Sequence, residues 1–400
     1  MQASSRARVL YVELNLDGTI GGSYFSLLYL VSGLDRERFE PRVVFASPNS
    51  LIDTYRAAGI DTRALKPRVP LRAGPLLRPL ARLINFFTAK LHSVTSVVRY
   101  FRLLRRERIA LLHLNNSVDT GSEWMLAAWL ARVPCVTHQR GLVRRSRGLH
   151  WYVRRLAAVV CISAAVRRDL EAAGFGYARL VTIFNGLDPA ALKVTRSAAQ
   201  VRAELGIDPA SRVIGMVGNI QRWKGQDVVL RALAALRADY PNLCCILIGA
   251  VSPNNVEDIA FHRELEASIA QLNLTGRVFL TGYRPDVPNY VNTLEILLHA
   301  SVQPEPFGRV LLEGMAQRKP VIACRAGGAE EIIEDEASGL LYPPGDVGEL
   351  AARIRRLLND DAFASHIGEA GHRRLIDVFG IRRNVADTEA LYRSILGIAS

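Results

Sequence analysis

Two glutamates stand eight positions apart in the second half of the chain, and a glycine between them opens a predicted helix. Glu305 belongs to a loop after an apolar strand, and Glu313 lies on the helix, about one turn from Arg309. A loop carboxylate can accept hydrogen bonds from sugar hydroxyls, and a helix carboxylate can hold a ribose diol. The free N–H groups of Gly308, Arg309 and Val310 can bind phosphate oxygens. The spacing also fits a glutamate that faces solvent.

A loop with two cations lies upstream of these glutamates. The segment from Gly215 to Asp227 is predicted to form a strand, a loop and a helix, and the loop offers Arg222 and Lys224 beside Gly225. Cations and free backbone N–H groups at the carboxyl end of a strand make a phosphate site. The alternative is a basic loop that contacts only solvent.

A glycine-rich loop follows the first predicted strand. It runs from Gly18 to Ser23 and opens a helix, and its Gly21 and Gly22 would let the backbone approach a diphosphate. The loop lacks the G-x-G-x-x-G pattern, and no acidic residue stands where a nicotinamide ribose needs one, which disfavours a dehydrogenase. Taken alone, the loop is also an ordinary strand-to-helix turn.

Among the eight histidines, two that lie on predicted strands are considered as site residues. His113 is expected to be a satisfied core residue. His138 ends a strand, where side chains point toward the ligand site of an open sheet, and it is a candidate site residue with a structural histidine as the alternative. No metal site is expected, because no ligand cluster and no Asp-x-Asp is present.

The composition is that of a globular protein of two domains. The chain has 400 residues, of which 49% are hydrophobic and 22% charged, and this excludes disordered and fibrous classes. The longest nearly apolar run, 156–166, is too short to cross a bilayer, and no secretory signal is recognised. The five cysteines lie in apolar runs and are expected to be buried thiols of a cytoplasmic protein.

Short apolar runs alternate with helix-length segments, as in parallel sheets covered on both faces. The βαβα pattern occurs twice and predicts two doubly wound α/β domains with a boundary in 188–211 and a ligand cleft between them. The predicted strands are Arg8–Leu14, Pro41–Ala46, Ile109–Leu114, Cys135–His138, Ala158–Ile162, Leu180–Phe184, Val213–Val217, Leu243–Ile248, Val278–Thr281, Ile296–His299, Val321–Cys324 and Leu340–Tyr342.

The motifs of the second half come in an order that resembles the donor-binding half of family 4 glycosyltransferases, which are retaining enzymes of the GT-B fold. The resemblance is strong from about residue 180 to 350 and weaker before it. One departure is Asn219, which stands where many members have arginine. The motifs are Asn185-Gly-Leu-Asp188, Gly218 with Lys224-Gly225, Thr281-Gly-Tyr-Arg284, Glu305-Pro-Phe-Gly308 with Glu313, Ala326-Gly-Gly328 with Glu330-Glu-Ile-Ile333, and Gly339 to Asp346.

The resemblance implies roles for individual residues. The diphosphate would be held by Arg222 and Lys224, the ribose by Glu313, and the transferred sugar by Glu305 and His138. The implied catalytic residues are therefore His138, Glu305, Arg222 and Lys224, and the implied nucleotide-sugar-binding residues are Gly21, Gly22, Tyr283, Arg284, Phe307, Gly308, Arg309, Val310 and Glu313.

The resemblance also implies a GT-B architecture of two Rossmann-like domains that face each other across a deep cleft. Residues 1–190 would bind the acceptor, residues 200–380 the nucleotide-sugar, and the last helix, within 382–400, would pack back on the first domain. The implied reaction moves a sugar from a UDP- or GDP-type donor to an acceptor hydroxyl with retention, in cell-surface polysaccharide or glycolipid synthesis. No tightly bound cofactor is implied. A nucleotide-sugar epimerase and a non-catalytic binding relative are the alternatives.

The positive charge is concentrated in the first half of the chain. Residues 1–200 hold 30 Lys and Arg against 13 Asp and Glu, and the segment 66–108 holds 11 against one. Much of that segment is predicted to be a basic amphipathic helix, which can lie on an anionic membrane surface at the inner face. The alternative is a helix whose apolar stripe packs on the sheet while its arginines are solvated. Nucleic acid is disfavoured because no binding motif accompanies the charge.

Overall fold

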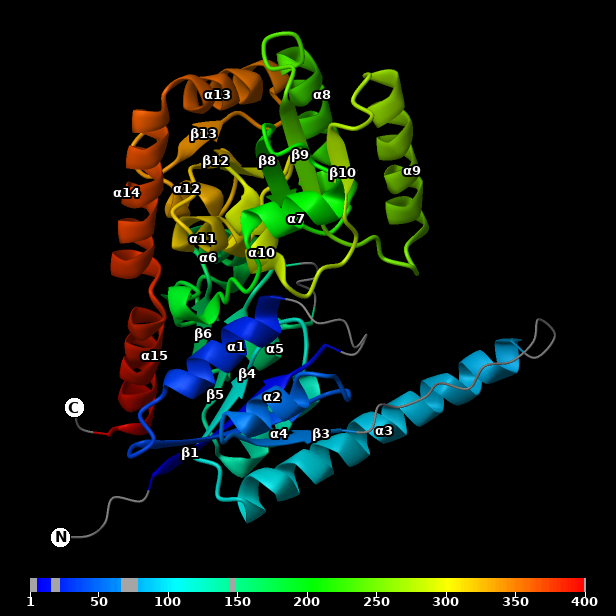
Figure 1. Ribbon diagram of the computed structural model, residues 1–400. Coiled ribbons are helices and arrows are strands. Elements are labelled where there is room, and N and C mark those ends of the chain that lie inside the picture. Colours follow the sequence, from blue (N-terminus) through cyan, green and yellow to red (C-terminus); the bar gives the residue numbers. More distant parts are fainter. Residues whose placement is uncertain (1–5, 16–21, 66–77, 144–147, 399–400) are drawn as a thin grey trace. The chain divides into compact units, whose positions relative to one another are not determined.

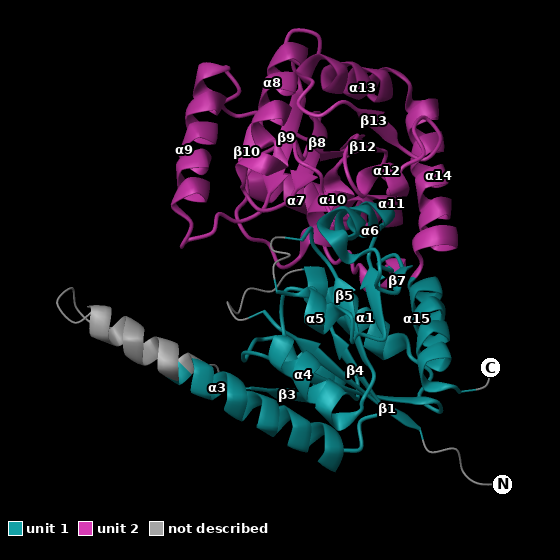
Figure 2. Cartoon of the chain, turned by 180° about the vertical axis from the view of Figure 1, so that it is seen from behind, with its two compact units in different colours: residues 1–186, 381–400 teal, residues 187–380 magenta. Residues whose placement is uncertain are grey.

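The computed structural model describes residues 6–15, 22–65, 78–143 and 148–398, without the side chains of 78–87 and 89. It divides into two compact units, one of residues 1–186 and 381–400 (unit 1) and one of residues 187–380 (unit 2) (Figure 2). Each unit is built on a parallel sheet with helices on both faces, so the predicted α/β class with two doubly wound domains is confirmed.

Unit 1 contains a parallel sheet in the order β3-β2-β1-β4-β5-β6-β7. Its strands are short and largely buried, which explains their almost continuous apolar runs. Their bounds are β1 Ala7–Glu13, β2 Phe39–Phe45, β3 Asp61–Ala64, β4 Leu111–Leu114, β5 Cys135–Gln139, β6 Ala158–Cys161 and β7 Leu180–Thr182.

The helices of unit 1 cover the two faces of this sheet with separate hydrophobic clusters. Helices α1, α2 and α15 pack on one face around Tyr11 and Phe45. Helices α3, α4 and α5 share the other cluster, around Leu112 and Trp124 (Figure 1). The helix bounds are α1 Gly22–Gly33, α2 Ile52–Ala57, α3 Arg78–Arg106, α4 Ser122–Ala131, α5 His150–Val153, α6 Ala164–Leu170 and α15 Ile381–Leu396.

Unit 2 contains a parallel sheet in the order β10-β9-β8-β11-β12-β13. Its strands are β8 Arg212–Val217, β9 Leu243–Ile248, β10 Val278–Leu280, β11 Ile296–His299, β12 Val321–Cys324 and β13 Leu340–Tyr342. Its helices are α7 Ala198–Leu205, α8 Gln226–Leu236, α9 Val256–Gln271, α10 Val287–Thr293, α11 Arg309–Ala316, α12 Ala329–Ile332, α13 Val347–Asn359 and α14 Asp361–Phe379.

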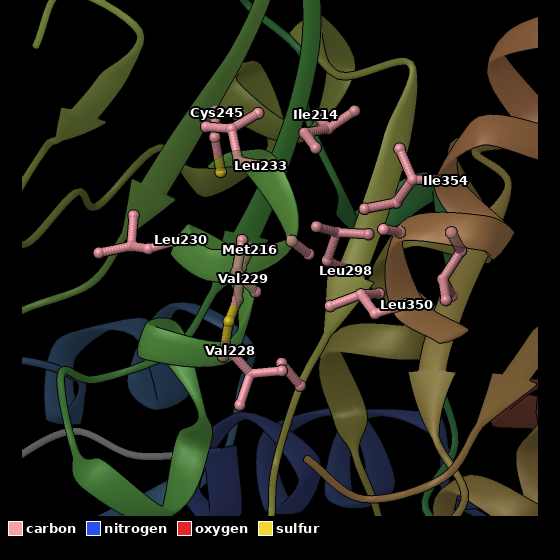
Figure 3. Close-up of a cluster of buried hydrophobic side chains, with 14 of the residues drawn as sticks. Ile214, Met216, Val228, Val229, Leu230, Leu233, Cys245, Leu298, Leu350 and Ile354 are labelled. Atoms are coloured by element: carbon pink, nitrogen blue, oxygen red, sulfur yellow. The ribbon is translucent and has the colours of Figure 1, made fainter. Parts of the chain in front are cut away.

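The core of unit 2 joins the sheet to helices α8 and α13. Met216 and Leu298, from neighbouring strands, meet Leu233 of α8 and Ile354 of α13 in one buried cluster (Figure 3). Because this cluster packs α8 against the sheet that contains β11, it also holds in place the loops at the ends of α8 and β11.

The structure differs from the sequence expectations in two places. Strand β3 was not predicted, because its Asp-Thr-Arg-Ala sequence is polar and it lies at the edge of the sheet. The predicted boundary 188–211 holds helix α7 of unit 2, which begins with a capping box between Ser197 and Gln200. The five cysteines are buried free thiols, as expected.

None of the helices in the described ranges combines the length and the hydropathy that a transmembrane span requires.

Candidate active site

The sheet order of unit 2 marks the carboxyl ends of β8 and β11 as a candidate ligand site. From β8 the chain continues through α8 to β9 on one side, and from β11 it continues through α11 to β12 on the other. Two adjacent strands whose connections diverge leave a crevice at their carboxyl ends, and open α/β sheets bind ligands there. The loop after β8 carries Lys224, and the loop after β11 carries Glu305.

Lys224 and Glu305 form the centre of a compact polar cluster in this crevice. The Lys224 Nζ lies 2.8 Å from one Glu305 carboxylate oxygen. The other oxygen lies 2.5 Å from His299 Nε2 and accepts a hydrogen bond of 2.9 Å from the Ser301 hydroxyl. The Lys224 Nζ also lies 4.1 Å from the centroid of the Trp223 ring. The cluster therefore holds a cation and an anion in fixed positions.

The charge state of Glu305 follows from these contacts. Burial by itself would raise the pKa of this carboxyl, but His299 and Lys224 outweigh it and hold the pKa well below the usual range. Glu305 is therefore ionised at neutral pH, and its carboxylate can accept hydrogen bonds.

Gly225 allows the Lys224 loop to lie against the end of β11. Gly225 has φ +76°, and a Cβ at this position would lie 2.1 Å from the carbonyl oxygen of Ala300. The backbone of Val302 also donates a 2.8 Å hydrogen bond to the carbonyl of Trp223. Only glycine fits this approach, so the position of Lys224 depends on it.

Replacing Gly225 by alanine is expected to lower the free energy of unfolding by about 3 kcal/mol, because the new Cβ meets backbone and the left-handed φ disfavours it. The measurement is urea unfolding of the full chain. Gly345→Ala is the matched control, since Gly345 has φ +74° with nothing within 4 Å of its Cβ position. The control is expected to cost only about 1 kcal/mol. Equal losses in the two variants would show that the contact with Ala300 is unimportant.

A second glycine loop supports Glu305 from the side of β12. The Gly328 N–H donates a 2.8 Å hydrogen bond to the Glu305 carbonyl, and Gly327 pairs with Glu305 as an isolated parallel bridge. A Cβ on Gly328 would lie 2.5 Å from the Phe307 Cα. The Ala-Gly-Gly motif of the sequence therefore makes room for the backbone that carries Glu305.

Helix α11 starts at the same crevice. Gly308 precedes it with φ +93°, while Phe307 is buried and Val310 is half-buried. Arg309 and Glu313 form an ion pair of 3.2 Å across one turn, as their spacing predicts. Burial raises the pKa of Glu313, and Arg309 partly offsets this shift. The helix thus places its N-terminus and the Glu313 carboxylate at the carboxyl end of β11.

Three residues of the predicted site make contacts that do not involve Lys224 or Glu305. The Arg222 guanidinium makes two hydrogen bonds of 2.7 and 2.8 Å to Glu264 on α9. Arg284 pairs with Glu204 of α7 at 3.0 Å. Tyr283 is 70% exposed and presents an open aromatic face.

In unit 1 the chain connections diverge between the adjacent strands β1 and β4, as they do between β8 and β11 in unit 2. Glu13 ends β1 and is fully buried, and it accepts a 2.6 Å hydrogen bond from the Asn115 amide after β4. Asn116 donates to the other Glu13 oxygen, and Arg140 bonds the Asn115 side-chain oxygen at 2.7 Å. Burial raises the pKa of Glu13 despite these partners. Gly22, which follows at the start of α1, is described, whereas Gly21 lies outside the described residues.

His138 lies in unit 1 with its side chain buried against the sheet face that α15 covers. Its Nδ1 lies 2.6 Å from Nε2 of His113, and the other nitrogen of His113 contacts the Tyr392 hydroxyl. That hydroxyl donates 2.9 Å to Tyr11. His113 is thus a satisfied core histidine, as expected. His138 Nε2 is buried without a hydrogen-bond partner in the described structure, so it is the atom available to a ligand.

Both histidines are neutral. Burial, reinforced by Arg140, lowers the pKa of His113 to about 3 and that of His138 well below its ordinary value. A neutral His138 can donate or accept one hydrogen bond at Nε2, and it carries no charge to stabilise a phosphate.

Sequence reasoning missed several residues of these clusters. His299 stands at the end of an apolar strand and gave no signal of its own, although a histidine six residues before a loop glutamate could have been tested as its partner. Glu13 and Asn115 are 102 positions apart, and only the parallel pairing of β1 with β4 brings them together. Among the described residues, no group of three His, Cys, Asp or Glu is placed to hold a metal.

Family models match both halves of the chain. Residues 197–374 match the model described as glycosyl transferases group 1, and residues 20–191 match the model described as glycosyltransferase family 4. Together the two matches span most of the chain, and the chain is a glycosyltransferase in both of its halves. Its Lys224–Glu305 crevice lies within the first of these matches, and its Glu13 and His138 strands belong to the other half.

Curated relatives and solved structures agree with this family. The lipopolysaccharide core biosynthesis mannosyltransferase LpcC of Rhizobium leguminosarum is 27% identical over 295 residues, which cover 73% of this chain and 80% of LpcC. A glycosyltransferase structure from Rickettsia africae superposes with a TM-score of 0.81 at 20% identity, covering 99% of this chain and all of that one. The structure of Anabaena HepE in complex with UDP-glucose has a TM-score of 0.76 at 25% identity, covering 96% and 99%. The fold is that of the GT-B glycosyltransferases.

Proposed function

We propose that this glycosyltransferase moves a hexose from a nucleoside-diphosphate sugar to an acceptor hydroxyl with retention of the anomeric configuration. The observation that carries the proposal is the fixed Lys224–Glu305–His299 cluster at the start of α11. It combines a cation for phosphate, an ionised carboxylate for sugar hydroxyls and a helix N-terminus in one crevice.

Each part of the crevice suits one part of such a donor. Lys224 and the N–H groups that open α11 suit the diphosphate, and Glu305 suits the hydroxyls of the sugar. Glu313, one turn into α11, suits the ribose diol. Arg222 sits on the same loop as Lys224, and it would have to leave Glu264 to reach the diphosphate.

The proposed mechanism needs neither a metal nor a carboxylate nucleophile. The bond between the anomeric carbon and the phosphate oxygen breaks, and the acceptor oxygen bonds to the same carbon on the same face. The proton of the acceptor hydroxyl passes to the departing phosphate oxygen. Lys224 and the α11 amides stabilise the negative charge that develops on the leaving diphosphate. His138 would accept or donate one hydrogen bond to the transferred sugar.

The donor and acceptor classes rest on the relatives and on unit 1. HepE is seen with UDP-glucose, and LpcC is named as a mannosyltransferase of the lipopolysaccharide core. We therefore propose a UDP- or GDP-type hexose donor and a glycan or lipid-linked acceptor in cell-surface polysaccharide or glycolipid synthesis, at the inner membrane face. The acceptor would bind unit 1 near Glu13 and Arg140, at the carboxyl ends of its strands.

Retention is tested by the configuration of the first product. The chain is incubated with α-linked UDP- and GDP-hexoses, and the sugar released by slow transfer to water is followed by proton NMR before it mutarotates. The proposal expects the α-anomer to appear first with a single donor base. A β-anomer would contradict retention, and release of an epimerised sugar would favour an epimerase.

The pH dependence of donor binding is expected to report Glu313. Its pKa is raised above the ordinary value of 4.5, so the carboxylate that accepts the ribose hydroxyls becomes protonated as the pH falls through that raised value. Nucleotide affinity should therefore fall with the pH in the range above 4.5. Glu305 stays ionised there because its pKa is lowered.

The Glu313→Gln variant is expected to bind nucleotide more weakly at neutral pH, and its nucleotide affinity should no longer fall as the pH is lowered. The measurement is calorimetric titration with a nucleoside diphosphate at several pH values. The stability of the nucleotide-free protein should depend on pH in the opposite direction. A raised pKa of Glu313 in the folded state stabilises the fold below 4.5, and this contribution is lost as the pH rises through the folded pKa. If the nucleotide affinity of the variant falls in acid as that of the wild type does, Glu313 is not the source of this pH dependence.

A further inference from the structure

Four polar side chains of unit 1 form one buried, hydrogen-bonded row against helix α15. Tyr11 of β1, His113 of β4 and His138 of β5 come from three neighbouring strands, and Tyr392 comes from α15 (Figure 2). Tyr11 is the register partner of His113, and His113 is the partner of Val136, two residues before His138. Because side chains alternate along a strand, the three strand residues share the sheet face that α15 covers.

The proton positions within this row depend on one another. The four side chains are at most 1% exposed, so their polar atoms rely on one another for hydrogen bonds. Burial lowers the pKa of both histidines, and a neutral imidazole has one N–H donor and one acceptor nitrogen. Each hydrogen bond holds a single proton between its two heavy atoms. The donor at one end of the row therefore determines the donor at the other end.

Tyr392 gives the row its direction. Its hydroxyl donates a 2.9 Å hydrogen bond to the Tyr11 oxygen, and with its one proton used there it can only accept from His113 Nδ1. His113 is therefore protonated at Nδ1, and its Nε2 carries a lone pair. That Nε2 lies 2.6 Å from His138 Nδ1, which must supply the proton. It follows that the lone pair of His138 is on Nε2.

The surroundings of Tyr11 agree with this direction. Burial raises the pKa of Tyr11, the hydrogen bond from Tyr392 lowers it, and the Glu389 carboxylate on α15 raises it again, with Arg36 as a smaller opposing influence. A nearby carboxylate attracts the Tyr11 proton, so an oxygen lone pair of Tyr11 is left for Tyr392. Tyr11 therefore acts as the acceptor that ends the row.

We propose that Tyr11, Tyr392 and His113 are positioning residues that hold His138 in the tautomer protonated at Nδ1, so that its Nε2 accepts a hydrogen bond from a hydroxyl of the transferred sugar. The part that concerns the sugar rests on the proposed transfer reaction. His138 Nε2 is buried and has no hydrogen-bond partner within the described ranges.

This tautomer selects the chemistry of the group that meets His138. An unprotonated Nε2 can bind a group with a proton to donate, such as a hydroxyl. It disfavours a carboxylate or carbonyl oxygen, which can only accept, because the two lone pairs would face each other. Unit 1 is therefore expected to prefer a sugar with a hydroxyl at the contacted position over one with an ionised carboxyl group there.

The first test is ¹⁵N NMR of the histidine rings in the full chain without nucleotide. The chemical shift distinguishes a protonated from an unprotonated ring nitrogen, and His138→Gln assigns the signals of His138 by their loss. The proposal expects a protonated Nδ1 and an unprotonated Nε2 on His138. A protonated Nε2 in the wild type would overturn it.

Tyr11→Phe is the variant that tests the row itself. It removes the acceptor of Tyr392, so the freed hydroxyl proton can turn to His113 Nδ1 and reverse every hydrogen bond that follows. The expected result is a proton on His138 Nε2, three side chains away from the change. A purely structural Tyr11 would lower the Tm and leave the His138 tautomer as it is, and that outcome would also overturn the proposal.

Tyr55→Phe is the matched control. Tyr55 is fully buried in the same hydrophobic cluster as Tyr11, and its hydroxyl donates 2.6 Å to the Tyr24 carbonyl instead of to the row. The control therefore also removes one buried phenolic hydroxyl. It should lower the Tm to a similar extent and leave the histidine signals unchanged.

The second test measures kcat/KM with a nucleotide-hexose and with analogues in which one hydroxyl at a time is replaced by fluorine, which cannot donate. At the contacted position, the preference of the wild type for hydroxyl over fluorine should shrink about tenfold in Tyr11→Phe, because a protonated Nε2 no longer needs a donor. The comparison between variants cancels the effect of fluorine on the reactivity of the sugar. Tyr55→Phe should keep the wild-type preference.

The two tests separate the tautomer from the transfer reaction. An equal preference in wild type and Tyr11→Phe at every position would overturn the assigned hydrogen bond to the sugar. If no nucleotide-sugar is turned over, the proposed transfer reaction fails, whereas the spectra of the nucleotide-free chain still decide whether Tyr11, Tyr392 and His113 set the His138 tautomer.

Discussion

Lys224→Ala is expected to lower the rate constant of sugar transfer by about 10²- to 10³-fold. Lys224 is the cation fixed in the crevice by Glu305, so its loss removes a preorganised charge from the leaving diphosphate. The effect should fall on kcat more than on KM, because the charge that Lys224 stabilises grows in the transition state. The measurement is steady-state kinetics of nucleoside diphosphate release.

The fold should survive this change, since His299 and Ser301 continue to hold Glu305. Lys193→Ala is the matched control, because Lys193 is an exposed lysine of the same unit. It should keep the wild-type rate. If Lys224→Ala loses less than about threefold with normal stability, Lys224 does not act on the leaving group.

Glu305→Gln is expected to reduce transfer by about 10²-fold and also to destabilise unit 2. The amide keeps the shape of the side chain but leaves Lys224 without its counter-charge and presents an N–H₂ group where His299 or Lys224 needs an acceptor. Breaking such a partly buried pair is expected to cost about 2 kcal/mol. The measurements are transfer kinetics and urea unfolding at neutral pH.

The sign of the stability effect follows from the lowered pKa of Glu305. A depressed pKa in the folded state stabilises the fold above the ordinary value of 4.5, and this contribution disappears only as the pH falls through the lower folded pKa. The difference between wild type and Glu305→Gln should therefore be full at neutral pH and shrink in acid. Glu330→Gln, at an exposed position, should show neither effect. A constant difference from neutral to strongly acidic pH would contradict the assigned charge state.

The repeated βαβα pattern was enough to predict the two sheets, because buried parallel strands leave continuous apolar runs. Strands β9, β11, β12 and β13 have the predicted bounds. Strand β3 escaped because three of its four residues, Asp61, Thr62 and Arg63, are polar and its stability comes from pairing with β2. Helix α7 escaped because its alanine-rich sequence follows a turn signal and resembles a linker.

The candidate site was predictable where chemistry and local spacing coincide. Lys224 and Glu305 stand in loops whose glycines mark strand ends, and Arg309 and Glu313 are one helical turn apart. The contacts of Arg222 were not predictable, because Glu264 lies 42 positions away on α9 and only the packing of that helix brings it near. The chain from His138 through His113 to Tyr392 likewise depends on α15, which returns to unit 1 after the whole of unit 2.

The most direct test of the central claim is thermal unfolding of wild type and Glu313→Ala with UDP, GDP or ADP. A ligand at 100 times its Kd should stabilise the folded protein by about 2.7 kcal/mol, which raises the Tm by several degrees. With a nucleotide-sugar site at α11, one of the three nucleotides should raise the Tm of the wild type, and Glu313→Ala should lose the rise. A wild type that responds to none of them, or a variant that keeps the full rise, would contradict a nucleotide-sugar site at α11.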